Sequence, residues 1–72
     1  MLTNVLKGKI VAAGYSQKTL AEAMTGAGSK ISENTLSKKV NGRVPFDTDE
    51  VACICKLLGI HDNEEKAYIF LV

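Results

Sequence analysis

Apolar residues recur along the chain at spacings of three and four, and the alternating spacing of a β-strand is absent. Leu6 and Ile10 form such a pair near the start, and Val51, Ile54 and Leu58 form a longer series further on. Spacings of three and four place side chains on one face of an α-helix, where they can pack together. We therefore predict an all-α fold.

Capping residues and glycines divide this pattern into helices. Ser16 and Ser32 stand where an N-cap side chain accepts a hydrogen bond from the first turn. An aspartate followed three residues later by a glutamate, the spacing of a capping box, occurs at Asp47 and again at Asp62. Glycines follow the apolar series and favour helix ends. Five helices are predicted, over about residues 3–13, 16–24, 32–41, 47–58 and 62–72, with residues 43–46 extended.

Length and composition indicate one small domain spanning residues 1–72. The chain has 72 residues, of which 46% are hydrophobic and 24% charged, as in an ordinary soluble domain. A domain of this size buries only about 60% of the surface of its unfolded chain, so it has little core to spare. It has no run of about 18 apolar residues and no leader segment, from which we expect a cytoplasmic protein.

The usage of cysteine and histidine argues against metal sites and catalysis. Cys53 and Cys55 lie two apart in a predicted helix, which sends their side chains to different faces, and His61 is the single histidine. We expect small buried or half-buried thiols here. The sequence shows no Ser-His-Asp arrangement and no phosphate-binding glycine loop after a strand. We therefore expect no enzymatic activity, cofactor, metal, membrane contact or small-molecule substrate.

Charge is distributed unevenly. Residues 1–45 carry seven basic and two acidic side chains, a net charge of +5. Residues 46–72 carry two basic and six acidic side chains, a net charge of −4. One end of the protein is thus suited to an anionic partner, whereas the other end would repel it.

Three segments carry a family pattern: YSQKTLAEAM at 15–24, ISENTLSKKVNGRVPF at 31–46 and DEVACICKLLGI at 49–60. Over about residues 4–60 the chain resembles the lambda-repressor-like (Cro/C1-type) helix-turn-helix family. Within that family it is most similar to the small modulator-of-repression and Cro-like regulators of temperate lactococcal phages. The resemblance implies a five-helix DNA-binding domain, with its helix-turn-helix at about residues 16–42, acting in a bacterial host cell.

Several side chains in these segments suit DNA contacts. A helix N-terminus attracts phosphate, and Gln17 adds a donor there. On an exposed third helix, Asn34 suits adenine, Glu33 suits cytosine and Lys38 suits guanine in the major groove. The resemblance adds the positions after that helix, which hold the DNA backbone. The candidate DNA-binding residues are Gln17, Lys30, Glu33, Asn34, Thr35, Lys38, Asn41 and Arg43. These residues also have explanations that need no DNA. Gln17 and Asn34 can be ordinary surface residues, and Lys38 can belong to a solvated lysine face. Asn41 can simply end the helix.

The chain also departs from the family pattern in ways that weaken DNA binding. The link TGAGSK is about five residues longer than the usual tight turn, and we expect it to loosen the angle between the two helices or to push a loop towards the DNA backbone. Glu33 lies where the reading helix would first meet phosphates, and only five or six cations are available to neutralise them.

The C-terminal run AYIFLV is the third departure, because a short helix buries one stripe and not all sides. One interpretation is that its aromatic residues pack over the first and fourth predicted helices. The other is a partner surface, since Tyr and Phe are enriched at interface centres. The candidate partner-binding residues are Phe46, Asp47, Glu64, Glu65, Tyr68 and Phe70.

Two functions follow from these observations. The first is an antirepressor that binds the N-terminal DNA-binding domain of the cognate phage repressor, blocks its operator binding and promotes the lytic programme. Operator DNA would then be bound weakly or jointly with the repressor. The alternative is a Cro-like transcription factor that binds operator DNA directly through the third helix. The long TGAGSK link, the net negative charge of residues 46–72 and the apolar C-terminal run AYIFLV favour the antirepressor.

Overall fold

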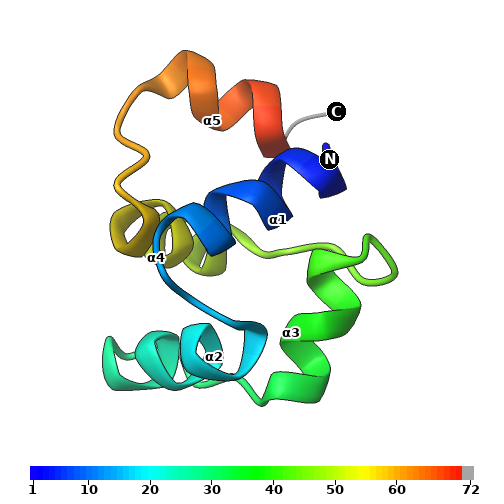
Figure 1. Ribbon diagram of the computed structural model, residues 1–72, viewed down its shortest axis with the longest axis vertical. Helices are drawn as coiled ribbons and strands as arrows, with labels where there is room; N and C mark the ends of the chain where they lie inside the picture. Colours follow the sequence, from blue (N-terminus) through cyan, green and yellow to red (C-terminus); the bar gives the residue numbers. More distant parts are fainter. Residues whose placement is uncertain (71–72) are drawn as a thin grey trace.

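The computed structural model describes residues 1–70, which form five α-helices and contain no strand (Figure 1). The all-α prediction is therefore confirmed for this part of the chain. The last two residues of the apolar run, and with them the predicted end of the fifth helix at residue 72, lie outside the described residues. The helices are α1 (Thr3–Ala12), α2 (Gln17–Gly26), α3 (Glu33–Val40), α4 (Thr48–Leu58) and α5 (Asn63–Phe70).

The predicted caps of α2, α3 and α4 are present. Ser16 Oγ accepts the Thr19 N–H at 3.1 Å, and Thr19 Oγ1 accepts the Ser16 N–H at 2.8 Å, so α2 begins with a reciprocal box. Ser32 Oγ accepts an N–H of the first turn of α3. At α4, the Glu50 N–H donates to Asp47 Oδ1 at 2.7 Å and the Asp47 N–H donates to Glu50 Oε1 at 2.9 Å. These bonds satisfy N–H groups that the helices themselves leave without partners.

The capping box predicted at Asp62 is wrong in its second half. Asp62 Oδ1 accepts the Glu64 N–H at 2.9 Å, as an N-terminal aspartate should. Glu65 instead lies 3.4 Å from Lys9 Nζ and joins α5 to α1. A glutamate side chain at this position can accept a hydrogen bond from a backbone N–H or pair with a nearby cation. Because α5 packs on α1, Lys9 is close enough to Glu65 to form an ion pair.

The link between α2 and α3 is more ordered than its glycine content predicts. α2 continues through residue 26, two residues beyond the predicted end, and terminates where Gly28 adopts φ 99°. The Ser29 N–H donates to Met24 O at 2.9 Å, which completes a glycine-terminated helix end. Thr25 Oγ1 then bridges to Ile31, accepting its N–H and donating to its carbonyl, both at 3.2 Å. These hydrogen bonds connect the longer link to the end of α2 and to the residue before the N-cap of α3.

The core lies where α2 packs against α3 and α4 and where α1 packs against α3 and α5 (Figure 1). The stripe predicted for α4 needs one correction, since Val51 and Leu58 are only half-buried while Cys55 is buried beside Ile54. Val51 and Leu58 still pack against the core; how deeply each residue is buried depends on the tilt of the helix on its neighbours, which periodicity alone does not determine. The largest fully buried side chains are Leu6, Leu20, Met24, Leu36, Val40, Ile54, Cys55, Ile60 and Ile69.

The N-terminal residues lie against the end of α5. The Leu2 N–H donates to the Ile69 carbonyl at 2.8 Å, and Ile69 is fully buried. Met1, Phe46 and Phe70 all pack against the core from positions far apart in the sequence. This arrangement brings the start of the chain, the connection between α3 and α4, and α5 to one place.

Candidate functional site

The outward face of α3 carries three of the side chains predicted to contact DNA. Leu36 and Val40 are fully buried, which turns the opposite side of the helix to solvent. Glu33, Asn34 and Lys38 are all exposed on α3. The sequence pattern placed these residues correctly, because burial of the apolar stripe determines which face remains outside.

Thr35 and Asn41 use their side chains within the helix. Thr35 Oγ1 accepts a hydrogen bond from Ser32 Oγ at 3.0 Å, so this oxygen already has one hydrogen-bond partner at the start of α3. Asn41 Nδ2 donates to the Ser37 carbonyl at 2.8 Å and Asn41 is the C-cap of α3. The two roles considered for Asn41 were a DNA contact and the end of the helix, and in the structure Asn41 ends α3.

Gln17, Lys30 and Arg43 come from segments outside α3. Gln17 is half-buried at the start of α2 and lines a hollow shared with Lys7 and Tyr15, on the side of α1. Lys30 is exposed in the link before α3, and Arg43 is exposed after its end. These cations flank α3 at both ends, which suits contacts to two separate phosphates.

The ion pair between Lys39 and Glu50 joins α3 to α4. Lys39 Nζ lies 2.5 Å from Glu50 Oε1 and 2.6 Å from Oε2, and Glu50 is only 8% exposed. Since Glu50 Oε1 also accepts the Asp47 N–H, its carboxylate ties the end of α3 to the start of α4. Sequence reasoning missed this pair. The available signal was that Glu50 precedes Ile54 by four residues and therefore lies on the apolar stripe.

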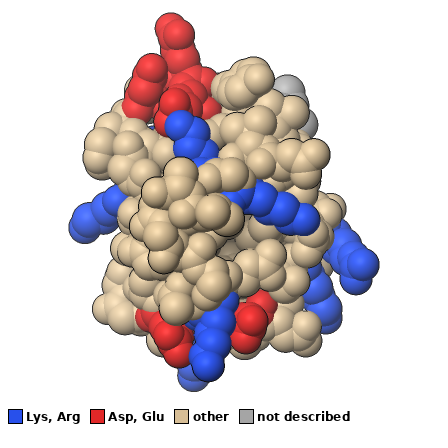
Figure 2. Space-filling view, viewed as in Figure 1, with Lys and Arg blue, Asp and Glu red and all other residues tan. Residues whose placement is uncertain are grey.

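The face formed by α2 and α3 is only weakly positive. Lys39 is neutralised by Glu50, and within residues 1–70 no carboxylate pairs with the other cations of this face. Glu22 of α2 and Glu33 of α3 line the same shallow hollow as Lys18. In Figure 2, acidic side chains flank basic ones at the end of the molecule where α2 and α3 lie. Four cations (Lys18, Lys30, Lys38 and Arg43) against these two carboxylates leave a net charge of +2.

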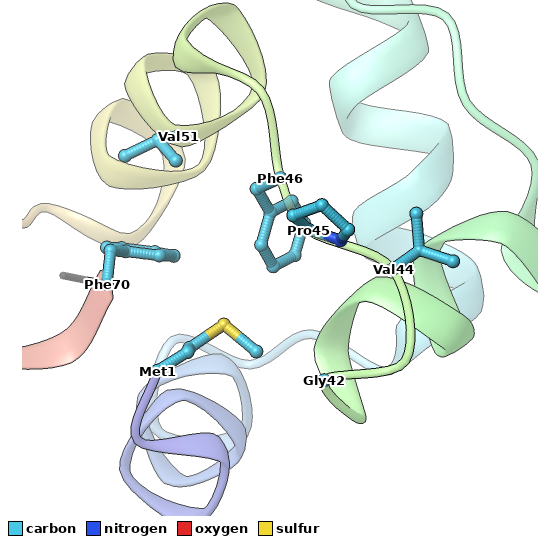
Figure 3. A pocket seen from close by; sticks show the side chains of 7 residues that line it. All are labelled: Met1, Gly42, Val44, Pro45, Phe46, Val51 and Phe70. Atoms are coloured by element: carbon cyan, nitrogen blue, oxygen red, sulfur yellow. The ribbon is translucent and has the colours of Figure 1, made fainter. Parts of the chain in front are cut away.

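A second candidate surface surrounds the ring pair of Phe46 and Phe70. Their ring centroids are 5.9 Å apart and the ring planes meet at 85°, an edge-to-face contact. Figure 3 shows the two rings approaching from the segment before α4 and from α5, with Met1 beside them. They border an open hollow of about 290 Å³, and both rings are half-buried. Asp47, the N-cap of α4, borders a neighbouring hollow with the same rings.

The remaining predicted partner residues lie on other faces of α5. Tyr68 is 63% exposed, and Glu64 precedes it by one turn on the same outward face. Glu65 is half-buried, and its charge is partly offset by Lys9. Of the two interpretations of the C-terminal run, packing describes Phe70, which contacts the core, whereas Tyr68 remains exposed.

A family model described as a protein of unknown function (DUF739) matches residues 3–71. The chain belongs to the DUF739 family. The match includes all five helices described above, so the α2–α3 face and the ring pair both lie within the family domain. No curated protein and no solved structure matches the chain.

The described part of the DUF739 protein has neither a membrane-spanning helix nor a metal-binding cluster. None of the helices formed by residues 1–70 is long and apolar enough to cross a bilayer. Within the same residues, no three or more His, Cys, Asp or Glu side chains gather in a way that would hold a metal ion.

The two thiols of the DUF739 protein are expected to differ in reactivity. Burial raises the pKa of the Cys55 thiol, an effect that the Lys66 charge partly offsets. Cys55 is 1% exposed, whereas Cys53 is half-buried. The reactive species is the exposed thiolate, so Cys53 should react with Ellman's reagent at least about tenfold faster. Rates measured on Cys53→Ala and Cys55→Ala variants assign the two phases. Equal native rates would contradict the burial of Cys55, and both thiols should react alike in denaturant.

Proposed function

We propose that this protein is an antirepressor of the lambda-repressor-like helix-turn-helix class. It would bind the DNA-binding domain of the cognate phage repressor, block operator binding and promote the lytic programme. The sequence resemblance supports the class. Its support in the structure is a pair of adjacent packed helices, α2 and α3, each capped by serine, with polar side chains on the outward face of the second.

The observation that carries the proposal is the weak charge of the α2–α3 face. Affinity for duplex DNA depends on neutralising phosphates, and about six contacts are typical of a firm binder. Lys39 is withdrawn into its pair with Glu50, and Glu33 stands in the first turn of α3, where phosphates would approach. A face with a net charge of +2 supports, at best, weak DNA binding.

The opposite end of the molecule supplies a surface that suits a basic protein. Carboxylates gather where α5 begins, as Figure 2 shows at the upper end of the view. The half-buried rings of Phe46 and Phe70 lie nearby, with Asp47 beside them. An apolar centre with an acidic rim complements the DNA-reading face of a repressor, which must itself be basic.

A Cro-like factor is the second candidate, and one observation favours it. Asn34 and Lys38 are exposed on one side of α3, and both residue types read base edges in the major groove. Thr25 and the Lys39–Glu50 pair hold α3 in a fixed orientation, as a reading helix requires.

Generic duplex DNA tests the choice between the two candidates. We expect fluorescence anisotropy to show no saturation up to about 100 μM protein at about 200 mM salt, and a shallow salt dependence. A basic helix-turn-helix protein serves as the positive control. Dissociation constants near 10⁻⁵ M or lower, with a steep loss on going from about 50 to about 200 mM salt, would support the Cro-like function instead.

The repressor encoded in the same genome tests the antirepressor function directly. With the repressor bound to labelled operator DNA, adding this protein should release the DNA, and the two proteins should elute together in gel filtration. If the repressor stays bound to its operator at a large excess of this protein, the antirepressor proposal is wrong.

A further inference from the structure

Two hollows meet at the ring pair and form one continuous groove. The first, of about 290 Å³, and the second, of about 490 Å³, share Phe46, Val51 and Phe70 as walls. Figure 3 shows the first hollow, in which Val51 and Phe70 lie on one side of Phe46 and Val44 lies on the other. The ring pair borders both hollows and lies where they meet, so the groove has a first and a second compartment, each open to solvent.

The second compartment is built from helical faces. On α5 it is lined by Asn63, Lys66, Ala67 and Phe70, which recur at three and four and therefore lie on one side of that helix. Ala52 of α4 is exposed on the opposite wall. A groove between two helices with an apolar floor matches the shape of an amphipathic helix, which places apolar side chains at similar intervals.

Acidic side chains lie on the two helices that flank the second compartment. Asp47 borders it directly, Asp49 lies in the first turn of α4, and Glu64 lies in the first turn of α5. All three are exposed. The described residues that line the two compartments carry one carboxylate, Asp47, and one cation, Lys66, so the acidic excess that favours a cationic partner comes from the flanking Asp49 and Glu64.

A second copy of this chain fits the groove poorly. Docking needs two apolar anchors on one exposed helix face, and the large exposed apolar side chains within residues 1–70 are Val11, Val44 and Tyr68. Val11 lies on α1, Val44 in the connection after α3, and Tyr68 on α5, so no helix offers two of them.

We propose that this groove is the docking site for a basic amphipathic helix of the partner protein. One apolar side chain of that helix enters each compartment, on either side of the Phe46–Phe70 pair. Its Lys and Arg residues lie over Asp47, Asp49 and Glu64. The inference rests on the proposed function in that the partner is the repressor, and it adds which surface of this protein binds and which element of the partner is bound.

The test introduces a bulky cation into the groove without touching the core. Ala52→Arg fills the second compartment from an exposed helical position, and Ala67→Arg does so from the other wall. Ala12→Arg, at an exposed position of α1 outside the groove, is the matched control. Circular dichroism verifies that each variant is folded. The probes are the helix-turn-helix domain of the repressor encoded in the same genome and an 18-residue Leu/Lys amphipathic peptide, with its Leu/Glu counterpart as a control.

We expect Ala52→Arg and Ala67→Arg to weaken repressor binding at least about tenfold and Ala12→Arg to leave it unchanged. Double charge reversal at Asp49 and Glu64 should weaken it as well, whereas reversal at Glu22 and Glu33 should not. If the repressor binds the groove variants as tightly as the wild type, the groove proposal is overturned and the proposed function stands.

The peptide separates failure of the groove from failure of the proposed function. If the wild type does not bind the repressor, the antirepressor function fails, and the groove is judged on the peptide alone. Amide shifts of Val51, Ala52 and Phe70 with the Leu/Lys peptide, absent with the Leu/Glu peptide and lost in Ala52→Arg, support a site for a basic helix. Absence of those shifts with the Leu/Lys peptide overturns it.

Discussion

Glu50→Ala is expected to lower the free energy of unfolding by about 3–5 kcal/mol. The change leaves Lys39 Nζ almost buried without its carboxylate partner, and it removes the acceptor of the Asp47 N–H. A domain of this length has roughly 4–11 kcal/mol in total, so the variant loses a large share of its stability. Urea unfolding followed by circular dichroism at 222 nm measures the loss.

Asp49→Ala provides the matched control for this prediction. Asp49 is the preceding carboxylate of the same first turn, but it is exposed and has no ion pair within residues 1–70. Its loss removes only a favourable interaction with the helix dipole, about 0.3–1 kcal/mol. Replacing both partners, as Lys39→Met with Glu50→Leu, should recover most of the stability, because no buried charge remains alone. If Glu50→Ala costs no more than Asp49→Ala, the pair is screened by solvent and does not join α3 to α4.

Leu36→Ala is expected to cost about 2–5 kcal/mol of unfolding free energy. Leu36 is fully buried, and with Val40 it forms the whole buried surface of α3, whose length is eight residues. So short a helix has little stability of its own, and its packing on α2 holds it in place. The midpoint of thermal unfolding should fall by roughly 4–8 °C for each kcal/mol lost.

Asn34→Ala tests whether this effect belongs to burial and not to the helix in general. Asn34 is exposed on the same helix, two residues before Leu36, and its replacement should change stability by less than about 0.5 kcal/mol. Similar midpoints for the Leu36→Ala and Asn34→Ala variants would contradict the buried position of Leu36.

Helix positions were predictable because they depend on local chemistry. Ser16, Ser32 and Asp47 cap helices in the structure as their spacing predicts, and the buried side of α3 follows from Leu36 and Val40. The prediction failed where a residue had two local options. Thr25 and Gly26 were assigned to a loop by composition, but they continue α2 because the chain reaches its left-handed turn only at Gly28.

The candidate sites were less predictable than the helices. Exposure of Glu33, Asn34 and Lys38 follows from periodicity, so that face was identified correctly. The partner candidates were chosen by composition, and the structure distributes them over different surfaces: Phe46 and Phe70 in the groove, Tyr68 outside it, and Glu65 against Lys9. Composition does not determine which side of α5 faces the rest of the protein.

By itself, the sequence determined the all-helical fold, the helix starts and the outward face of α3, since capping and apolar periodicity act over a few residues. The tertiary structure alone decided the pairing of Lys39 with Glu50, the tie between Thr25 and Ile31, and the groove beside Phe46 and Phe70. Each of these depends on how helices tilt and pack against one another. That arrangement is determined by the shapes of many side chains together, and no short stretch of the sequence encodes it.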